Sequence, residues 1–264
     1  MIFGYFHEGS GLGDQLFRYI TVRTIAEQKG YEWGMWQPKN FKGNEFMSLN
    51  MGNPVEQNME YGFFQEKDVR DAQGNDIRSY DPEVNFIRDW MSIDGSFEDD
   101  KYWRHNLQNI KEWLKTEPLD VSDDTCVTGF RGGEYAHNQD LFLTREYWES
   151  AMFKMPGKEF EVHTDDPGTA CVILAPMVTS SVRLKYIENN QISHSKHSNM
   201  GFNWRSMRNA KYAIIPNSAF FILPRILKHL EDPEAITIAP RYWARRNVGV
   251  WARPACYYPE FLYI

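Results

Sequence analysis

Cysteine is scarce in this sequence. Its three cysteines, Cys126, Cys171 and Cys256, lie far apart among 264 residues, and no Cys-x-x-Cys pair occurs. Such an odd and sparse set argues against a disulfide framework and against a zinc site. It predicts instead three buried thiols that behave as small apolar side chains. We therefore expect the chain to work in the reducing environment of the cytoplasm.

Long apolar runs and a basic leader are also missing. The longest apolar runs, residues 171–175 and 219–223, each end at a proline. Both fall far short of the roughly 20 residues that a membrane span needs. The apolar residues 1–6 carry no basic leader and Glu8 lies close behind them, a pattern unlike a secretion signal. The sequence thus predicts no membrane span.

Positive charge is in deficit. The chain has 29 lysines and arginines against 36 aspartates and glutamates, which gives a net charge of −7. A module that binds bulk nucleic acid usually shows the opposite balance, so this class of partner is disfavoured. A local basic cleft that binds a small anion is still compatible with the net charge.

Aromatic residues, by contrast, are abundant: Phe, Trp and Tyr make up 15% of the residues. Such rings fill a core, and they also stack on bases and line sugar sites.

Several signature motifs are absent as well. No Asp-x-Asp motif occurs, so a metal site of the kind used by many sugar-nucleotide transferases is unsupported, and we expect neither a metal nor another cofactor. The sequence has no Gly-x-Ser-x-Gly and no Walker loop, which disfavours a serine hydrolase and a P-loop kinase. No acidic residue ends an obvious second strand, where a Rossmann dehydrogenase would bind the ribose.

Strands and helices alternate along the chain. Residues 2–6 predict a buried strand, followed by a glycine loop and a helix that ends near Gly30. The same order returns later, with strands predicted at 125–130, 159–163, 212–215 and 235–239 and helices at 144–153 and 219–230. The polar stretch 117–124 is the best candidate for a boundary. We predict an α/β fold of two doubly wound halves that share a cleft, with an N-terminal lobe at 1–118 and a C-terminal Rossmann-like lobe at 119–264.

One further helix is predicted after Ser96. Ser96 and Asp99 have the spacing of a capping box with a shorter acid. An apolar stripe at helical spacing follows, made up of Trp103, Leu107, Ile110 and Leu114. Residues 33–73 are rich in Gly, Asn, Pro and aromatics, and the pattern assigns no strand to them.

Polar residues directly after the predicted strands are the candidate binding groups, because ligands of open α/β sheets bind at the carboxyl ends of the strands. They are Gly11, Gly13 and Gln15 in the first loop, Arg131 with Glu134, Asp165 with Asp166, and Asn217 with Ser218. A glycine loop before a helix offers bare N–H groups to phosphate, and an arginine binds a diphosphate through two hydrogen bonds. A carboxylate accepts two N–H donors of a guanine edge. Together these groups predict a site for a nucleoside diphosphate.

Each candidate also has an ordinary structural interpretation. The glycine loop lacks the Gly-x-Gly-x-x-Gly spacing and fits a tight turn. Asp165 and Asp166, followed by Pro167, fit a helix N-cap with proline in the first turn. Arg131 can be a surface charge, although the glycines after it allow the backbone to approach another group closely.

Several segments, taken in order, resemble an inverting fucosyltransferase superfamily, which contains the bacterial α-1,2-fucosyltransferases and, more distantly, the α-1,6- and protein O-fucosyltransferases. The family motif GGLGNQLFQYA is similar to GSGLGDQLFRY at 9–19, and its HxRRGDY is similar to GFRGGEY at 129–135. Its later motifs TDDP, ANSSFSWW and IAPKRWF resemble TDDP at 164–167, PNSAF at 216–220 and IAPRYW at 238–243.

This resemblance implies a GT-B fold, two Rossmann-like halves facing a cleft, and a metal-independent transfer of L-fucose from GDP-fucose to a glycan hydroxyl. The N-terminal lobe would take the acceptor side and the C-terminal lobe the nucleotide-sugar donor. By position, Arg131 matches the arginine that supports the departing GDP, and Asp165 or Asp166 matches the carboxylate that reads guanine. Ser218 matches a serine that contacts phosphate. The resemblance identifies no catalytic base; Glu134 and Asp140 are the candidates nearest to the arginine in the sequence, and both also fit a structural role.

The chain also departs from the family pattern. Gly129 stands at the histidine that helps to hold the nucleotide, and Gly132 stands at the second arginine. Ile222 and Leu223 replace the tryptophan pair. Two alternatives therefore stay open: a relative that binds a sugar nucleotide or glycan without turnover, and an enzyme that uses a different nucleotide sugar.

Overall fold

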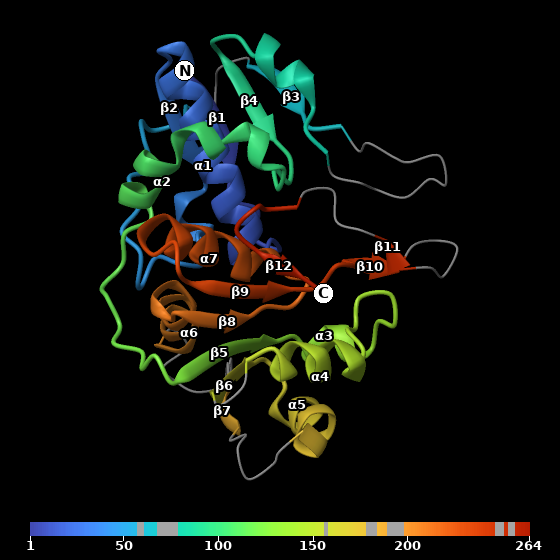
Figure 1. Ribbon diagram of the computed structural model, residues 1–264. Helices are drawn as coiled ribbons and strands as arrows, with labels where there is room; N and C mark the ends of the chain where they lie inside the picture. The colour runs from blue at the N-terminus through green and yellow to red at the C-terminus, as the bar shows by residue number, and fades with distance from the viewer. Residues whose placement is uncertain are drawn as a thin grey trace. The chain divides into compact units, whose positions relative to one another are not determined.

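The computed structural model describes residues 1–56, 61–67, 79–155, 158–177, 184–188, 198–245, 251–252 and 257–264. The chain divides into two compact units, Met1–Thr116 and Glu117–Ile264. Each unit is built on a parallel sheet accompanied by helices (Figure 1). The predicted α/β class is thereby confirmed. The assignment of acceptor and donor sides to the two lobes stays a prediction.

The N-terminal unit has a four-stranded sheet in the order β2-β1-β4-β3, and every pairing in it is parallel. Its elements are β1 (Ile2–Tyr5), α1 (Leu12–Lys29), β2 (Trp33–Trp36), β3 (Gly62–Gln65), β4 (Met91–Asp94) and α2 (Leu107–Trp113), with short 3-10 turns at Pro38–Asn40, Pro82–Phe86, Asp100–Tyr102 and Arg104–Asn106. Two of these strands, β2 and β3, lie in the segment 33–73, to which the sequence pattern assigns none.

Helix α1 follows the first strand as predicted. It ends at Gly30, whose φ of 68° is the left-handed conformation that glycine adopts without strain. The helix packs closely on β1, since a Cβ at Gly4 would lie 2.7 Å from a methyl group of Val22. The register of α1 therefore depends on a glycine in the middle of the first strand.

The helix predicted after Ser96 is shorter than expected. Asp99 caps a 3-10 turn, and α2 begins only at Leu107. The backbone N–H of Ser96 donates to the carboxylate of Glu66 at 2.6 Å, so Ser96 joins two loops and forms no capping box. Most of the predicted apolar stripe is nevertheless buried, at Trp103, Ile110 and Leu114.

The C-terminal unit has a six-stranded sheet in the order β12-β9-β8-β5-β6-β7, again parallel in every pairing. Its elements are β5 (Thr125–Phe130), α3 (Gly133–Ala136), α4 (Arg145–Phe153), β6 (Glu159–Thr164), α5 (Pro167–Leu174), a 3-10 turn (Ala175–Met177), β7 (Leu184–Glu188), α6 (Ser198–Asn209), β8 (Tyr212–Ile214), α7 (Ala219–Glu231), β9 (Ile236–Ala239) and β12 (Leu262–Tyr263). Strands β10 (Ala244–Arg245) and β11 (Trp251–Ala252) pair separately and antiparallel. All four strands and both helices predicted for this half are present.

Helices cover both faces of this sheet. On one face the ring of Phe130 in β5 lies 5.0 Å from that of Trp148 in α4. On the other face a Cβ at Gly129 would lie 2.6 Å from the ring of Phe221 in α7. Successive residues of a strand point to opposite faces, so these contacts define a doubly wound sheet.

The cysteines do not all follow the prediction of three buried thiols. Cys126 is buried in the core beneath α4, but Cys171 is exposed on α5. An exposed position on a helix whose inner face is occupied by Ala170 and Leu174 explains why the prediction is wrong for Cys171. Cys256 lies outside the described residues.

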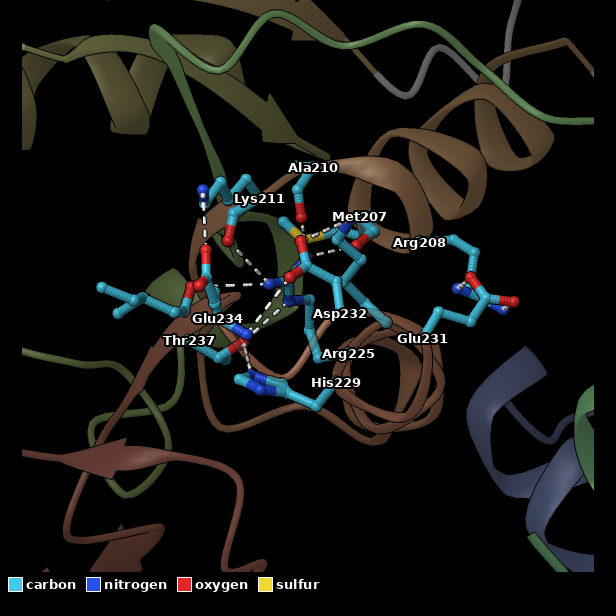
Figure 2. A network of polar contacts seen from close by, with 12 residues as sticks. Met207, Arg208, Ala210, Lys211, Arg225, His229, Glu231, Asp232, Glu234 and Thr237 are labelled. Carbon is cyan, nitrogen blue, oxygen red and sulfur yellow. Dashed lines mark hydrogen bonds and ion pairs between the residues drawn. The ribbon is translucent and has the colours of Figure 1, made fainter. Parts of the chain in front are cut away.

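A buried arginine fastens α7 to α6 and β9 (Figure 2). Arg225 is fully buried, and its Nη1 donates to the carbonyl oxygens of Met207 at 2.7 Å and Ala210 at 2.6 Å. Its Nε donates to the hydroxyl of Thr237 at 2.8 Å. Burial lowers the pKa of the guanidinium to about 9, while carbonyl oxygens at the end of a helix stabilise its charge. This network belongs to the amino ends of β8 and β9, so its role is structural.

Candidate functional site

The predicted site residues of the C-terminal unit lie at the carboxyl ends of neighbouring strands. Strands β8, β5 and β6 are adjacent in the sheet, so their carboxyl ends share one edge. The residues that follow them are Arg131 after β5, Asp165 and Asp166 after β6, and Asn217 and Ser218 after β8. The structure thus places these predicted groups at one edge of one sheet.

Arg131 is flanked by two carboxylates. Its Nη1 lies 2.6 Å from Oδ2 of Asp165, and its Nη2 donates to Oε1 of Glu134 at 3.0 Å. The guanidinium also lies over the ring of Tyr135, 4.9 Å from the centroid. Its Nε is buried and has no hydrogen-bond partner within the described part of the chain. Glu134 is 77% exposed, and such exposed ion pairs contribute little, so an incoming anion could displace it at small cost.

Asp165 connects the ends of β5 and β6. One carboxylate oxygen pairs with Arg131, and the other accepts the N–H of Gly132 at 2.8 Å. A Cβ on Gly133 would lie 2.9 Å from Oδ2 of Asp165, and one on Gly132 would lie 2.6 Å from the Cβ of Asp166. The glycines after the arginine therefore allow a close approach, and the group that approaches is the neighbouring loop.

Asp166 caps helix α5. Its Oδ1 accepts the N–H of Thr169 at 3.0 Å, and its Oδ2 accepts the hydroxyl of the same residue at 2.5 Å. Both hydrogen bonds hold the pKa of Asp166 below its ordinary value, and the bond from the Thr169 hydroxyl has the larger effect. The helix-cap interpretation is confirmed for this aspartate, with Pro167 as the first residue of the helix. Asp165 is then the carboxylate left to act beside Arg131.

Asn217 and Ser218 lead into α7. Asn217 is buried, and its Nδ2 donates to the carbonyl oxygens of Leu141, at 2.9 Å, and Trp243. Its Oδ1 is buried with no partner among the described residues. Ser218 is the N-cap residue, but its side chain makes no capping bond to the helix. Asn217 therefore positions the loop, and Ser218 stands where the N–H groups of a 13-residue helix suit an anion.

The glycine loop belongs to the N-terminal unit. Gly11 is the exposed N-cap of α1, and Gly13 is buried in the first turn. Gln15 is fully buried; its Nε2 donates to the carbonyl of Asn40 and its Oε1 accepts the N–H of Lys42, both at 2.9 Å. Gln15 thus fastens the helix to the segment after β2. A nucleotide-binding role for the loop residues stays a prediction.

The sequence pattern did not indicate a second polar cluster in this unit. His7 follows β1 and Asp94 ends the adjacent strand β4, and Nε2 of His7 lies 2.9 Å from Oδ2 of Asp94. Arg18 of α1 places its Nε 2.9 Å from Oδ1 of the same carboxylate. The position of His7 directly after the predicted strand 2–6 was the one available signal. Asp94 had none, because β4 was not predicted.

The residues that the structure describes contain neither a cluster suited to a metal ion nor a helix suited to a membrane. Within those ranges, no group of three or more His, Cys, Asp or Glu side chains could hold a metal ion. In the same part of the chain, no helix combines the length and the apolar character needed to cross a membrane. Metal independence and a cytoplasmic location stay predictions.

No family model matches the chain, and no curated protein matches it in sequence. In structure it is similar to a mutant of Arabidopsis thaliana FUT1 in complex with GDP, with a TM-score of 0.53 and 8% identity over 96% of this chain and 73% of that one. It is also similar to E. coli heptosyltransferase WaaC with ADP (TM-score 0.46, 9% identity, 99% and 92% covered) and to NodZ α-1,6-fucosyltransferase co-crystallised with GDP (TM-score 0.44, 14% identity, 85% and 92% covered). The likeness to FUT1 establishes the fold: this chain has the α/β fold class of the GT-B glycosyltransferases.

Proposed function

We propose that this chain is an inverting glycosyltransferase that moves a sugar from a nucleoside diphosphate sugar, by preference GDP-fucose, to a glycan hydroxyl. The observation that carries the proposal is Arg131 at the carboxyl edge of the C-terminal sheet, with an unbonded Nε and an exposed, displaceable counter-ion. Doubly wound sheets bind nucleotides at this edge. FUT1, whose fold the chain shares, was solved in complex with GDP, and the sequence resemblance supports the same class of donor.

In the proposed reaction the oxygen of the acceptor hydroxyl attacks C1 of the sugar from the face opposite the diphosphate and loses its proton to a base or to water. The bond between C1 and the phosphate oxygen breaks, and its electron pair leaves with the diphosphate. Arg131 and the N–H groups at the start of α7 would stabilise this growing charge, at roughly 3 kcal/mol for one well-aimed donor. Asp165 would hold Arg131 in place, and Glu134 would serve as the counter-ion that the diphosphate displaces.

A nucleotide panel followed by thermal unfolding tests the donor site. GDP is expected to raise Tm more than ADP or UDP, because a ligand at 100 times its Kd stabilises by about 2.7 kcal/mol. Arg131→Ala should abolish the shift, and Arg131→Lys should not restore it, since lysine lacks the two-pronged guanidinium. Arg145→Ala, which removes an exposed arginine paired with Glu149 in the same unit, is the matched control. An undiminished shift in Arg131→Ala, or no shift with any nucleotide, would overturn the assignment.

Variants of Asp165 and Asp166 distinguish recognition of the guanine ring from support of Arg131. If Asp165 reads guanine, Asp165→Asn should erase the preference for GDP, by more than about tenfold in affinity. If it only braces Arg131, the same variant should weaken GDP, ADP and UDP alike. Asp166→Ala should leave the preference unchanged and lower the free energy of unfolding by about 1 kcal/mol, because it removes the side chain that caps α5.

A binding protein without turnover is the second candidate, and Gly129 favours it. The residue stands where the family resemblance has a nucleotide-holding histidine, and the ring of Phe221 fills the space that a side chain there would need. Release of GDP from GDP-fucose separates the two functions. Binding of GDP without release from the donor would favour the binding protein.

A further inference from the structure

A cavity of about 410 Å³ lies within the N-terminal unit. Its walls are the last turns of α1, the 3-10 turn Pro82–Phe86 and the two turns Asp100–Tyr102 and Arg104–Asn106. Helix α1 starts after the carboxyl end of β1 and ends before β2, so the cavity lies at the opposite end of α1 from the glycine loop. Its volume is in the range of small-molecule sites, roughly 300–1,000 Å³. The cavity is therefore a second candidate site, built by one unit alone.

The cavity has a buried apolar part and an ordered aromatic wall. Ile25, Val84 and Tyr102 line it and are buried. The ring of Tyr80 lies 4.7 Å from that of Tyr102, and its hydroxyl donates to Oδ1 of Asn85 at 3.3 Å. Packing and hydrogen bonding thus hold both rings in place. A ligand that enters the cavity meets apolar surface on the side of the protein core.

Three basic side chains line the same cavity: Lys29, Lys101 and His105. Over the described ranges of the chain, none of the three forms an ion pair, and no Asp or Glu lines the cavity. Nζ of Lys29 donates one hydrogen bond, to the carbonyl oxygen of Asn85 at 2.8 Å. An ammonium has three N–H donors, so two of them remain for a ligand. The lining therefore combines positive charge with unused hydrogen-bond donors.

The carboxylates around the cavity are engaged with other groups. Asp81 and Asp99 are buried, and each accepts backbone N–H groups of its own turn. Three further carboxylates on the same elements pair with cations that do not line the cavity. These pairs are Glu27 with Arg23, Glu83 with Lys67 and Asp100 with Arg104. An incoming anion thus needs to displace no carboxylate from the two lysines, although the whole chain is acidic.

We propose that this cavity binds a phosphorylated sugar; the inference does not depend on the proposed transfer. Lysines act as point charges that suit the oxygens of a phosphate, whereas a planar carboxylate is matched best by the fork of an arginine, and no described arginine lines the cavity. The amide of Gln28, exposed at the rim, can donate to and accept from sugar hydroxyls. Tyr80 and Tyr102 supply aromatic surface for the C–H face of the sugar ring.

Isothermal titration of the full chain with glucose 6-phosphate at low salt tests the site. Lys101→Met should weaken binding by about tenfold or more, because it removes a charged hydrogen-bond donor. The variant should keep the Tm of the wild type, since the side chain of Lys101 has no partner among the described residues. Lys115→Met removes an exposed lysine of the same unit outside the cavity and is the matched control. Glucose, glucuronate and inorganic phosphate are the comparison probes, and each should bind at least about tenfold more weakly than glucose 6-phosphate.

The outcomes keep this site apart from the proposed nucleotide site. A wild-type protein that does not bind glucose 6-phosphate, or that binds it no better than Lys101→Met, would overturn the inference. Glucuronate or inorganic phosphate bound as tightly as glucose 6-phosphate would also overturn it, because the cavity would then select charge alone. The rise in Tm with GDP should be the same in Lys101→Met, and Arg131→Ala should bind glucose 6-phosphate as the wild type does. Loss of glucose 6-phosphate binding in Arg131→Ala would place the ligand at the other site and contradict the assignment to this cavity.

Discussion

Gly129 should tolerate no side chain. A Cβ at this position would lie 2.6, 2.7 and 2.9 Å from three ring carbons of Phe221. Carbon atoms in contact prefer roughly 3.5–4.0 Å, so the ring would have to move by about 1 Å. Phe221 is only 4% exposed, and the density of a protein core resists such a shift. We expect Gly129→Ala to lower the free energy of unfolding by about 3 kcal/mol, the upper end of overpacking, or Tm by about 6–12 °C.

Urea unfolding of a double-mutant cycle tests this reasoning. Phe221→Ala alone should cost about 3–5 kcal/mol, because it leaves a cavity. In the double variant the new methyl group enters that cavity, so the total cost should fall short of the sum by about 2 kcal/mol. Gly9→Ala is the control, since a Cβ there meets nothing within 4 Å, and it should change stability by no more than about 0.5 kcal/mol. Strict additivity, or a cost as small as that of the control, would refute the reasoning.

Further predictions concern the buried Arg225, the partly buried carboxylate of Glu161 and metals. Arg225→Met should lower the free energy of unfolding by about 3 kcal/mol, because two carbonyl oxygens at the end of α6 lose their donor; an unchanged urea midpoint would contradict this. The hydrogen bond from His163 is the main reason why the pKa of Glu161 falls from 4.5 to about 2. A lowered carboxyl pKa adds stability above pH 4.5 that is lost as the pH falls toward 2, so Glu161→Gln should flatten the pH dependence of unfolding in that window. Transfer should survive EDTA because Arg131 supplies the positive charge at the diphosphate; a loss that Mg²⁺ restores would favour a metal-dependent enzyme.

The C-terminal unit was largely predictable, for physical reasons. A parallel strand covered by helices on both faces is a short apolar run, and polar or glycine residues mark its carboxyl end. The segments 125–130 and 159–163 have this form, and Arg131 and Asp165 were therefore expected at one edge. The sequence could not reveal that Asp165 pairs with Arg131 while its neighbour caps α5. Which aspartate takes which role depends on whether its carboxylate comes close to Arg131 or to the N–H of Thr169, and the folded conformation of the loops decides this.

The N-terminal unit was less predictable because its strands carry little pattern. Strand β3 exposes three of its four residues, so neither a continuous apolar run nor a strict alternation marks it. Without β4, nothing in the sequence brings Asp94 to His7, 87 positions earlier. The prediction of one helix after Ser96 was wrong for a related reason. The apolar stripe is present, but its first turns adopt 3-10 geometry, in which the same side chains still reach the core.

The two candidate groups share one structural device. Arg131 and His7 each follow a strand of a parallel sheet, and each is oriented by an aspartate at the end of the strand next to it. Beside an arginine, which is always charged, the carboxylate can only balance and aim the cation, so Arg131 is suited to an anionic leaving group. Beside an imidazole, the carboxylate selects the tautomer that carries its proton on the nitrogen facing it. The same kind of neighbour therefore has a different effect in each unit: it balances and aims the guanidinium of Arg131, and it orients the ring of His7 through Nε2.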